Sequence, residues 1–136
     1  MAASPSKHSE AAVLLGLAVG LRAFSAPGAL ALRHRPLNWP RRALLLAALG
    51  ELVADKLPST PSRLERRGLS ARVLSSAISG QLVAGPAGAA RAVGAALASA
   101  VTGNAVRNRV PGIATALCED GIAIVLASAG AARAGR

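Results

Sequence analysis

The sequence predicts an all-α integral membrane bundle of four to five helices, some of them short or broken at proline or glycine. Three observations favour this class. Hydrophobic residues make up 52% of the chain, yet it contains one Phe, one Trp and no Tyr. Small apolar residues therefore dominate, as they do where helices pack closely in lipid. The apolar residues form runs bounded by Pro and Gly, and most of the charged residues lie between these runs.

A length of 136 residues is that of one domain. Residues 1–9 are polar and are expected to form a flexible N-terminal tail. Residues 10–134 are expected to form a single helical membrane domain. Its helical segments are predicted at about 10–32, 41–56, 70–85, 87–109 and 113–132.

The first segment, 10–32, carries Arg22 within its apolar run. Its Leu, Val and Phe residues favour insertion by about 4 kcal/mol in total, and a central arginine opposes it by about 3 kcal/mol. Because this balance is narrow, we expect Arg22 to face protein or water rather than lipid. Pro27 should kink or end the helix near Ala26.

The second segment, 41–56, ends in three ionisable residues. From residue 41 to Asp55 the helix is about 20 Å long, which is short of a bilayer core of about 30 Å. The segment is therefore either a short, thinned span or a half-helix that ends at membrane depth. Pro58 follows Lys56 and stops the helix.

The region from residue 70 to 109 would be about 60 Å long as one straight helix, twice the bilayer core. It must therefore bend, and residues 85–86, Gly-Pro, are the expected place. A hairpin and a half-helix followed by a full span both fit. Residues 87–106 are rich in Ala, Gly and Ser, which is typical of a helix buried among helices, and Gly16 and Gly20 form a small face for a close helix neighbour.

Glu51 and Asp55 are four residues apart and therefore share one helix face. Carboxylates inside a membrane usually belong to an ion or proton pathway, or to a charge pair. In the first reading the two acids form an ion-binding face. In the second, Glu51 pairs with Arg22 or Arg91 and only links helices, while Asp55 belongs to a solvated helix end.

Glu119 and Asp120 lie in the last segment. Adjacent helical residues point about 100° apart, so we expect only one of them, Glu119, to face the same interior as Glu51. Two acids without a cation would make a proton site, whereas an arginine between them would keep both ionised. Both arrangements stay open. The candidate polar core is Arg22, Glu51, Asp55 and Glu119, flanked by Pro27, Lys56, Pro58, Arg91 and Asp120.

Catalysis and metal binding have no support in the sequence. His8 lies in the tail and His34 in a loop, and with Cys118 they form no ligand cluster. No segment matches a phosphate-binding loop, a dinucleotide fingerprint or a nucleophile elbow. We therefore expect no enzymatic activity, no cofactor and no metal.

The net charge of +10 comes almost entirely from arginines. A soluble nucleic-acid-binding protein would have such a charge, but basic loops beside anionic lipid explain it as well. We expect a multi-pass protein of the cell membrane that forms a homo-oligomer and binds anionic lipid at its basic loops, with no nucleic-acid partner. Basic residues are nearly balanced between the two sides, so the orientation is open.

Three blocks occur in order: G-L-R-x-x-x-x-P at 20–27, E-x-x-x-D-K-x-P at 51–58, and E-D-x-x-A-I at 119–124. Together they resemble a small bacterial membrane-protein family catalogued as domain of unknown function four-one-two-six. The resemblance covers about 11–129 and implies a multi-helix membrane protein, without assigning an activity. The sequence favours a transporter- or channel-like module built around the polar core. The alternative is a membrane scaffold or accessory subunit whose charges only pair helices.

Overall fold

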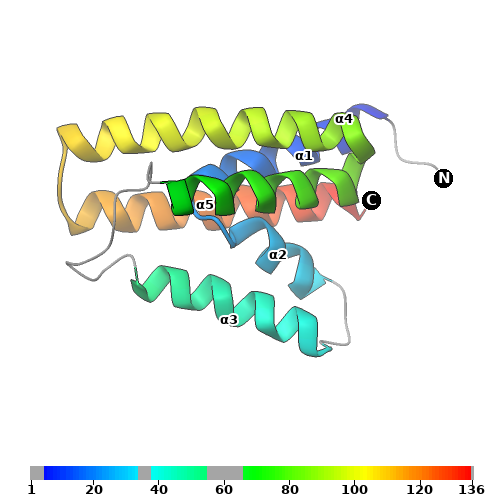
Figure 1. The fold of residues 1–136 in the computed structure, drawn as a ribbon, viewed down its shortest axis with the longest axis horizontal. Coiled ribbons are helices and arrows are strands. Elements are labelled where there is room, and N and C mark those ends of the chain that lie inside the picture. The colour runs from blue at the N-terminus through cyan, green and yellow to red at the C-terminus, as the bar shows by residue number, and fades with distance from the viewer. Residues whose placement is uncertain (1–4, 34–37, 55–65, 136) are drawn as a thin grey trace.

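The computed structural model describes residues 5–33, 38–54 and 66–135, and these residues form helices with no strand. The all-α class is therefore confirmed. Asp55, Lys56 and Pro58 of the candidate site lie outside the described residues. The helices, which Figure 1 shows, are α1 (Pro5–Leu21), α2 (Ser25–Arg33), α3 (Trp39–Ala54), α4 (Arg66–Arg109) and α5 (Ile113–Ala134).

The expected flexible tail over residues 1–9 is wrong from Pro5 onward, because α1 begins there. Proline is favoured in a first helical turn, since its fixed φ suits the helix and its missing N–H is not needed. This turn also has a tertiary partner: the imidazole Nδ1 of His8 donates a hydrogen bond to the carbonyl oxygen of Val83 at 3.0 Å. Residues 5–9 are thus part of the folded bundle.

The predicted segment 10–32 is two helices rather than one kinked helix. The break lies at residues 22–24, before Pro27 rather than at Ala26. Pro27 is the third residue of α2, where an N–H is not required for the helical ladder. Both the N–H and the hydroxyl of Ser25 donate to the carbonyl of Arg22, at 3.1 and 2.8 Å, which closes the turn.

The region 66–109 is a helical hairpin, the first of the two predicted alternatives. Ala84 and Gly85 have non-helical dihedral angles, and Gly85 has a φ of 63°, a conformation that glycine adopts without steric cost. The first arm (66–83) and the second arm (86–109) run antiparallel in Figure 1. Their backbones meet closely, because a Cβ added to Gly80 would collide with the carbonyl of Gly88.

Helix α1 is the centre of the bundle and packs against both α4 and α5. Its Leu15 and Val19 side chains are fully buried. Gly16 and Gly20 face the second arm of α4, where an added Cβ would overlap the backbone oxygens of Ala92 and Ala96, respectively. The predicted glycine face is therefore confirmed. The second arm itself buries only one stripe of small residues, so α1, not the second arm, is the enclosed helix.

Helices α2 and α3 lie along one side of this bundle, with α2 against α5 and α3 chiefly against α2 (Figure 1). One end of the bundle, called here the hairpin end, holds the start of α1, the turn of α4 and the end of α5. The opposite end holds residues 107–113 and the start of α4.

The distribution of polarity differs from that of an ordinary soluble protein, in which few charges are buried and most large apolar side chains are. Two helical stretches, Gly68–Arg109 and Ile113–Ala134, are long and apolar enough to cross a membrane, yet only 17% and 28% of their most apolar windows are buried. Large apolar side chains project outward from both of them. Among the residues that the structure describes, the buried polar ones are Arg22, Arg72, Ser75, Ser76, Ser79, Glu119 and Asp120.

The close approach of α1 and α4 gives a first prediction. Gly16→Ala should lower the free energy of unfolding by about 1–3 kcal/mol, because its methyl group overlaps the Ala92 backbone. The matched control is Gly94→Ala, a helical site with no atom within 4 Å of the added Cβ, which should gain up to about 1 kcal/mol. Thermal unfolding followed by circular dichroism in detergent measures both. Equal melting temperatures for the two variants would contradict the packing.

Candidate functional site at the break between α1 and α2

The break between α1 and α2 removes helical partners from two backbone N–H groups. The N–H of Arg22 still donates to the carbonyl of Ala18 at 2.8 Å and ends α1. In a continuous helix the N–H groups of Ala23 and Phe24 would donate to carbonyls four residues earlier. Instead both donate to one carboxylate, that of Glu51: Ala23 N to Oε1 at 2.7 Å and Phe24 N to Oε2 at 2.9 Å.

Glu51 reaches the break from α3, near its C-terminal end. Hydrogen bonds to a charged acceptor are roughly twice as strong as neutral ones. The first turn of α2 also presents the positive end of its helix dipole to the carboxylate. The Glu51 carboxylate thus links α3 to the break by accepting hydrogen bonds from backbone N–H groups of the break, and not by pairing with an arginine. The expected Glu51–arginine link is replaced by this contact, since no described ion pair contains Glu51.

The break also leaves carbonyl groups without their helical donors, and Arg72 of α4 fills this role. Its Nε donates to the carbonyl of Gly20 at 3.1 Å, and an Nη donates to the carbonyl of Gly68 at 3.1 Å. Arg72 is only 6% exposed. Arg72 is absent from the predicted polar core, because an arginine two residues into a predicted helix resembles a solvated helix end. Its neighbours Val73 and Ser76 in an apolar run were the available signal.

Two ion pairs complete the polar core. Arg22 pairs with Asp120 of α5, and both side chains are buried. Arg107, near the end of α4, pairs with Glu119 at 2.8 Å. The preference for Glu119 as the acid that shares an interior with Glu51 is corrected, because Asp120 pairs with Arg22 at the break and Glu119 pairs with Arg107. Both acids are buried, with Glu119 6% and Asp120 8% exposed.

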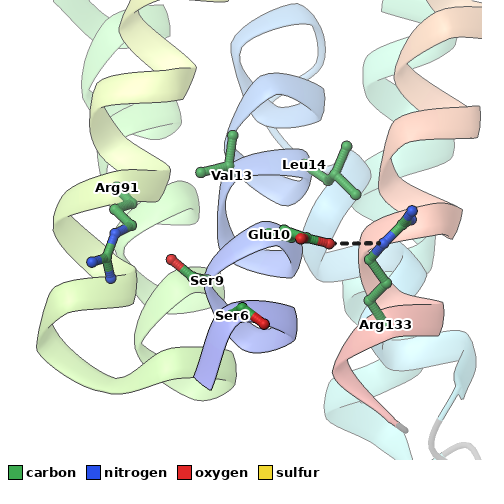
Figure 2. Close-up of a pocket in the computed structure, with 7 residues that line it drawn as sticks. All are labelled: Ser6, Ser9, Glu10, Val13, Leu14, Arg91 and Arg133. Atoms are coloured by element: carbon green, nitrogen blue, oxygen red, sulfur yellow. Dashed lines mark ion pairs between the residues drawn. The ribbon is translucent and has the colours of Figure 1, made fainter. Parts of the chain in front are cut away.

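Arg91 does not belong to the polar core, which corrects its predicted role as a counter-charge. It is exposed, and it lies next to Ala92 of the buried stripe, so the 100° step between neighbours turns it outward. Figure 2 shows it in an open pocket of about 540 Å³ at the hairpin end. In that pocket the carboxylate of Glu10 points instead toward Arg133, at 3.6 Å.

The charges of the core balance. The described residues bring together three arginines and three acids, so the core is electrically neutral when all are ionised. Of the two arrangements left open, the structure contains the one in which cations or backbone donors hold each acid. The core members are Arg22, Arg72, Arg107, Glu51, Glu119 and Asp120.

A small cavity gives access to part of this core. It has a volume of about 220 Å³, lies between α2, α3 and α5, and includes Arg22, Ser25 and Glu51 in its lining. Its other walls are mostly apolar. Within the described ranges no group of three or more His, Cys, Asp or Glu side chains is placed to hold a metal ion.

The buried Arg22–Asp120 pair supplies the second prediction. Asp120→Leu should lower the free energy of unfolding by about 3–5 kcal/mol, because it leaves Arg22 buried without this carboxylate. Adding Arg22→Met should recover part of the loss, since two apolar side chains need no partner. Glu10→Gln, which breaks the exposed pair with Arg133, should change stability by less than about 1 kcal/mol. Denaturant unfolding of the wild type, of Asp120→Leu, of Arg22→Met and of the double variant tests the cycle, and strictly additive losses in the double variant would reject the coupling.

Comparisons with known protein families, with curated proteins and with solved structures returned no match. The resemblance to the uncharacterised membrane family therefore stays a prediction. The polar core rests on the geometry described above.

Proposed function

We propose that this chain is a small multi-pass protein of the cell membrane and that the polar core is the centre of a transporter- or channel-like module. Two apolar helices alone are weak support for a membrane location, because core helices of soluble proteins pass the same test. Here the apolar windows are mostly exposed, and four charged side chains, those of Arg22, Arg72, Glu119 and Asp120, are buried. A lipid environment explains both features, since lipid solvates Leu, Ile and Val and excludes charge.

The lengths of the helices fit this environment. The two arms of α4 are about 27 and 36 Å long and α5 is about 33 Å long, against a bilayer core of about 30 Å. Helix α3 is about 24 Å long, and its end carries Glu51 to the break. The exposed apolar faces of α4 and α5 also suit contacts with further copies, in keeping with the expected homo-oligomer.

The observation that carries the transport proposal is the broken helix. Backbone outside a helix is tolerated in a membrane only where protein or water satisfies its polar groups. In secondary transporters such breaks bind substrates and ions, because they present helix ends and uncoiled N–H and C=O groups. The break at 22–24 has this character: Glu51 engages its donors and Arg72 its acceptor. In our proposal an ion exchanges with one of these internal charges during transport.

A scaffold or accessory subunit is the second candidate. The observation that favours it is the balance of the core, in which Arg22–Asp120 and Arg107–Glu119 are already paired. Buried polar networks of this kind can fix one arrangement of helices without binding a ligand. In that case the core determines assembly, and replacing its acids affects stability but no flux.

A flux assay separates these candidates. Purified protein is reconstituted in liposomes, and H⁺, Na⁺, K⁺ and Cl⁻ fluxes are measured with ion-sensitive dyes. We expect one of these ions to be conducted, and we expect Glu51→Gln and Glu119→Gln to reduce its flux at least tenfold. Glu10→Gln, the same change in an exposed acid, should leave flux unchanged. Wild-type flux in both core variants would reject the carboxylate pathway, and no flux of any ion by folded, inserted protein would favour the scaffold.

Cys118 tests the membrane location. It is exposed on α5, next to buried Glu119. In intact vesicles lipid should cover it, so a membrane-impermeant maleimide added on either side should label less than about a tenth of the protein, with full labelling after denaturation in detergent. A soluble protein would react at once in its native state. Rapid labelling of the native chain would therefore contradict the proposed membrane insertion.

A further inference from the structure

We propose that the groove between α2, α3 and the first arm of α4 binds one anionic phospholipid, with its headgroup at the hairpin end. This inference rests on the proposed membrane location and adds a specific ligand site to it. The site is separate from the polar core.

The groove is a cavity of about 640 Å³, within the range of about 300–1,000 Å³ typical of small-molecule sites. Its walls are mostly apolar. They include Phe24, Pro27 and Leu30 from the break and α2, and Leu74, Ile78 and Leu82 from the first arm of α4. Such walls suit an acyl chain, and the groove follows α2 for the length of that helix, about 14 Å.

Cationic side chains gather at one end of the groove. Arg33 is the last residue of α2, and Arg41 is the third residue of α3; both line the cavity. The guanidinium of Arg33 lies against Gly135, so this end is the hairpin end. No Asp or Glu is among the described residues that line the groove. An apolar channel with arginines at one end is complementary to an anionic amphiphile, because guanidinium groups bind phosphate oxygens strongly.

The buried hydroxyl of Ser79 suits a ligand that has a hydrogen-bond acceptor just below its headgroup. Its side chain is buried, at 1% exposure, and its hydroxyl has no hydrogen-bond partner among the residues that the structure describes. Ser79 lines the same groove, one helical turn inward from Val83, whose carbonyl accepts the His8 hydrogen bond. Buried hydroxyls are normally hydrogen-bonded. An ester carbonyl of a glycerophospholipid in the groove would accept this bond, because it lies next to the phosphate headgroup. A free fatty acid has no such group, so the hydroxyl favours a phospholipid.

Lipid binding is measured on the full chain in detergent by native mass spectrometry and by the rise of melting temperature with added lipid, comparing phosphatidylglycerol with phosphatidylcholine. We expect one phosphatidylglycerol per chain and a preference of at least tenfold over phosphatidylcholine. Arg33→Gln combined with Arg41→Gln should remove that preference. The control is Arg91→Gln, which replaces an exposed arginine in the pocket of Figure 2 and should retain the preference for phosphatidylglycerol.

Ser79 has a different expected signature. Ser79→Ala should weaken both lipids by a similar factor of about three, because both carry ester carbonyls. The control is Ser76→Ala, a buried serine whose hydroxyl already donates to the carbonyl of Arg72 at 2.7 Å and which does not line the groove. Equal affinities for the two lipids in the wild type, an equal loss of preference in Arg91→Gln, or a lipid-free dimer that covers the groove would each overturn the proposal.

Resistance to alkaline carbonate, measured on the membranes of the expressing cells before detergent is added, distinguishes a failure of the groove proposal from a failure of the proposed function. A protein that resists extraction but shows no lipid preference contradicts the groove proposal alone. A protein that is extracted as soluble contradicts the membrane proposal and, with it, the phospholipid.

Discussion

Two backbone N–H groups, those of Ala23 and Phe24, have no helical acceptor, and the carboxylate of Glu51 receives both at 2.7 and 2.9 Å. Buried donors without an acceptor are costly, so the break between α1 and α2 depends on this contact. The contact also holds α3, which otherwise packs chiefly on α2. The place of α3, the direction of α2 and the shape of both cavities beside α2 therefore follow from one carboxylate.

The remaining charges are arranged around the same break. Arg72 donates a hydrogen bond to a carbonyl at the end of α1, and Arg22 extends from the break to pair with Asp120. Arg107 pairs with Glu119, the residue before Asp120. The break and the helices α1, α3, α4 and α5 thus each contribute a charge or a backbone group to this cluster, whose described charges balance. Because the cluster is ordered by hydrogen bonds rather than by side-chain volume, it can fix the rotation of helices whose packing faces consist of Ala and Gly. Helix α2 connects this cluster to the groove, since it begins at the break and ends at Arg33.

Much of the fold follows from local sequence. The apolar runs predict the helices, Gly85-Pro86 predicts a bend, and Gly16 with Gly20 predicts a close neighbour. That the bend is the turn of a hairpin is decided by the structure. The start of α1 does not follow from local sequence, because Ser, Lys and His in residues 5–9 resemble a polar tail, while the contact from His8 to Val83 depends on a residue 75 positions away. Proline usually ends a helix, so the sequence predicts a break near Pro27, but here Pro27 lies in the first turn of the next helix.

The sequence by itself determined that the chain is helical and that Arg22, Glu51 and the acids at 119–120 stand apart from their apolar surroundings, because composition and spacing are local properties. Only the tertiary structure decided their partners. Arg22 and Asp120 are separated by 98 residues, and which side chains meet depends on the rotation of each helix about its axis. That rotation puts Arg72 and Arg107 in the core and turns Arg91 outward. It also assigns Glu51 to backbone donors that exist only because the helix is broken.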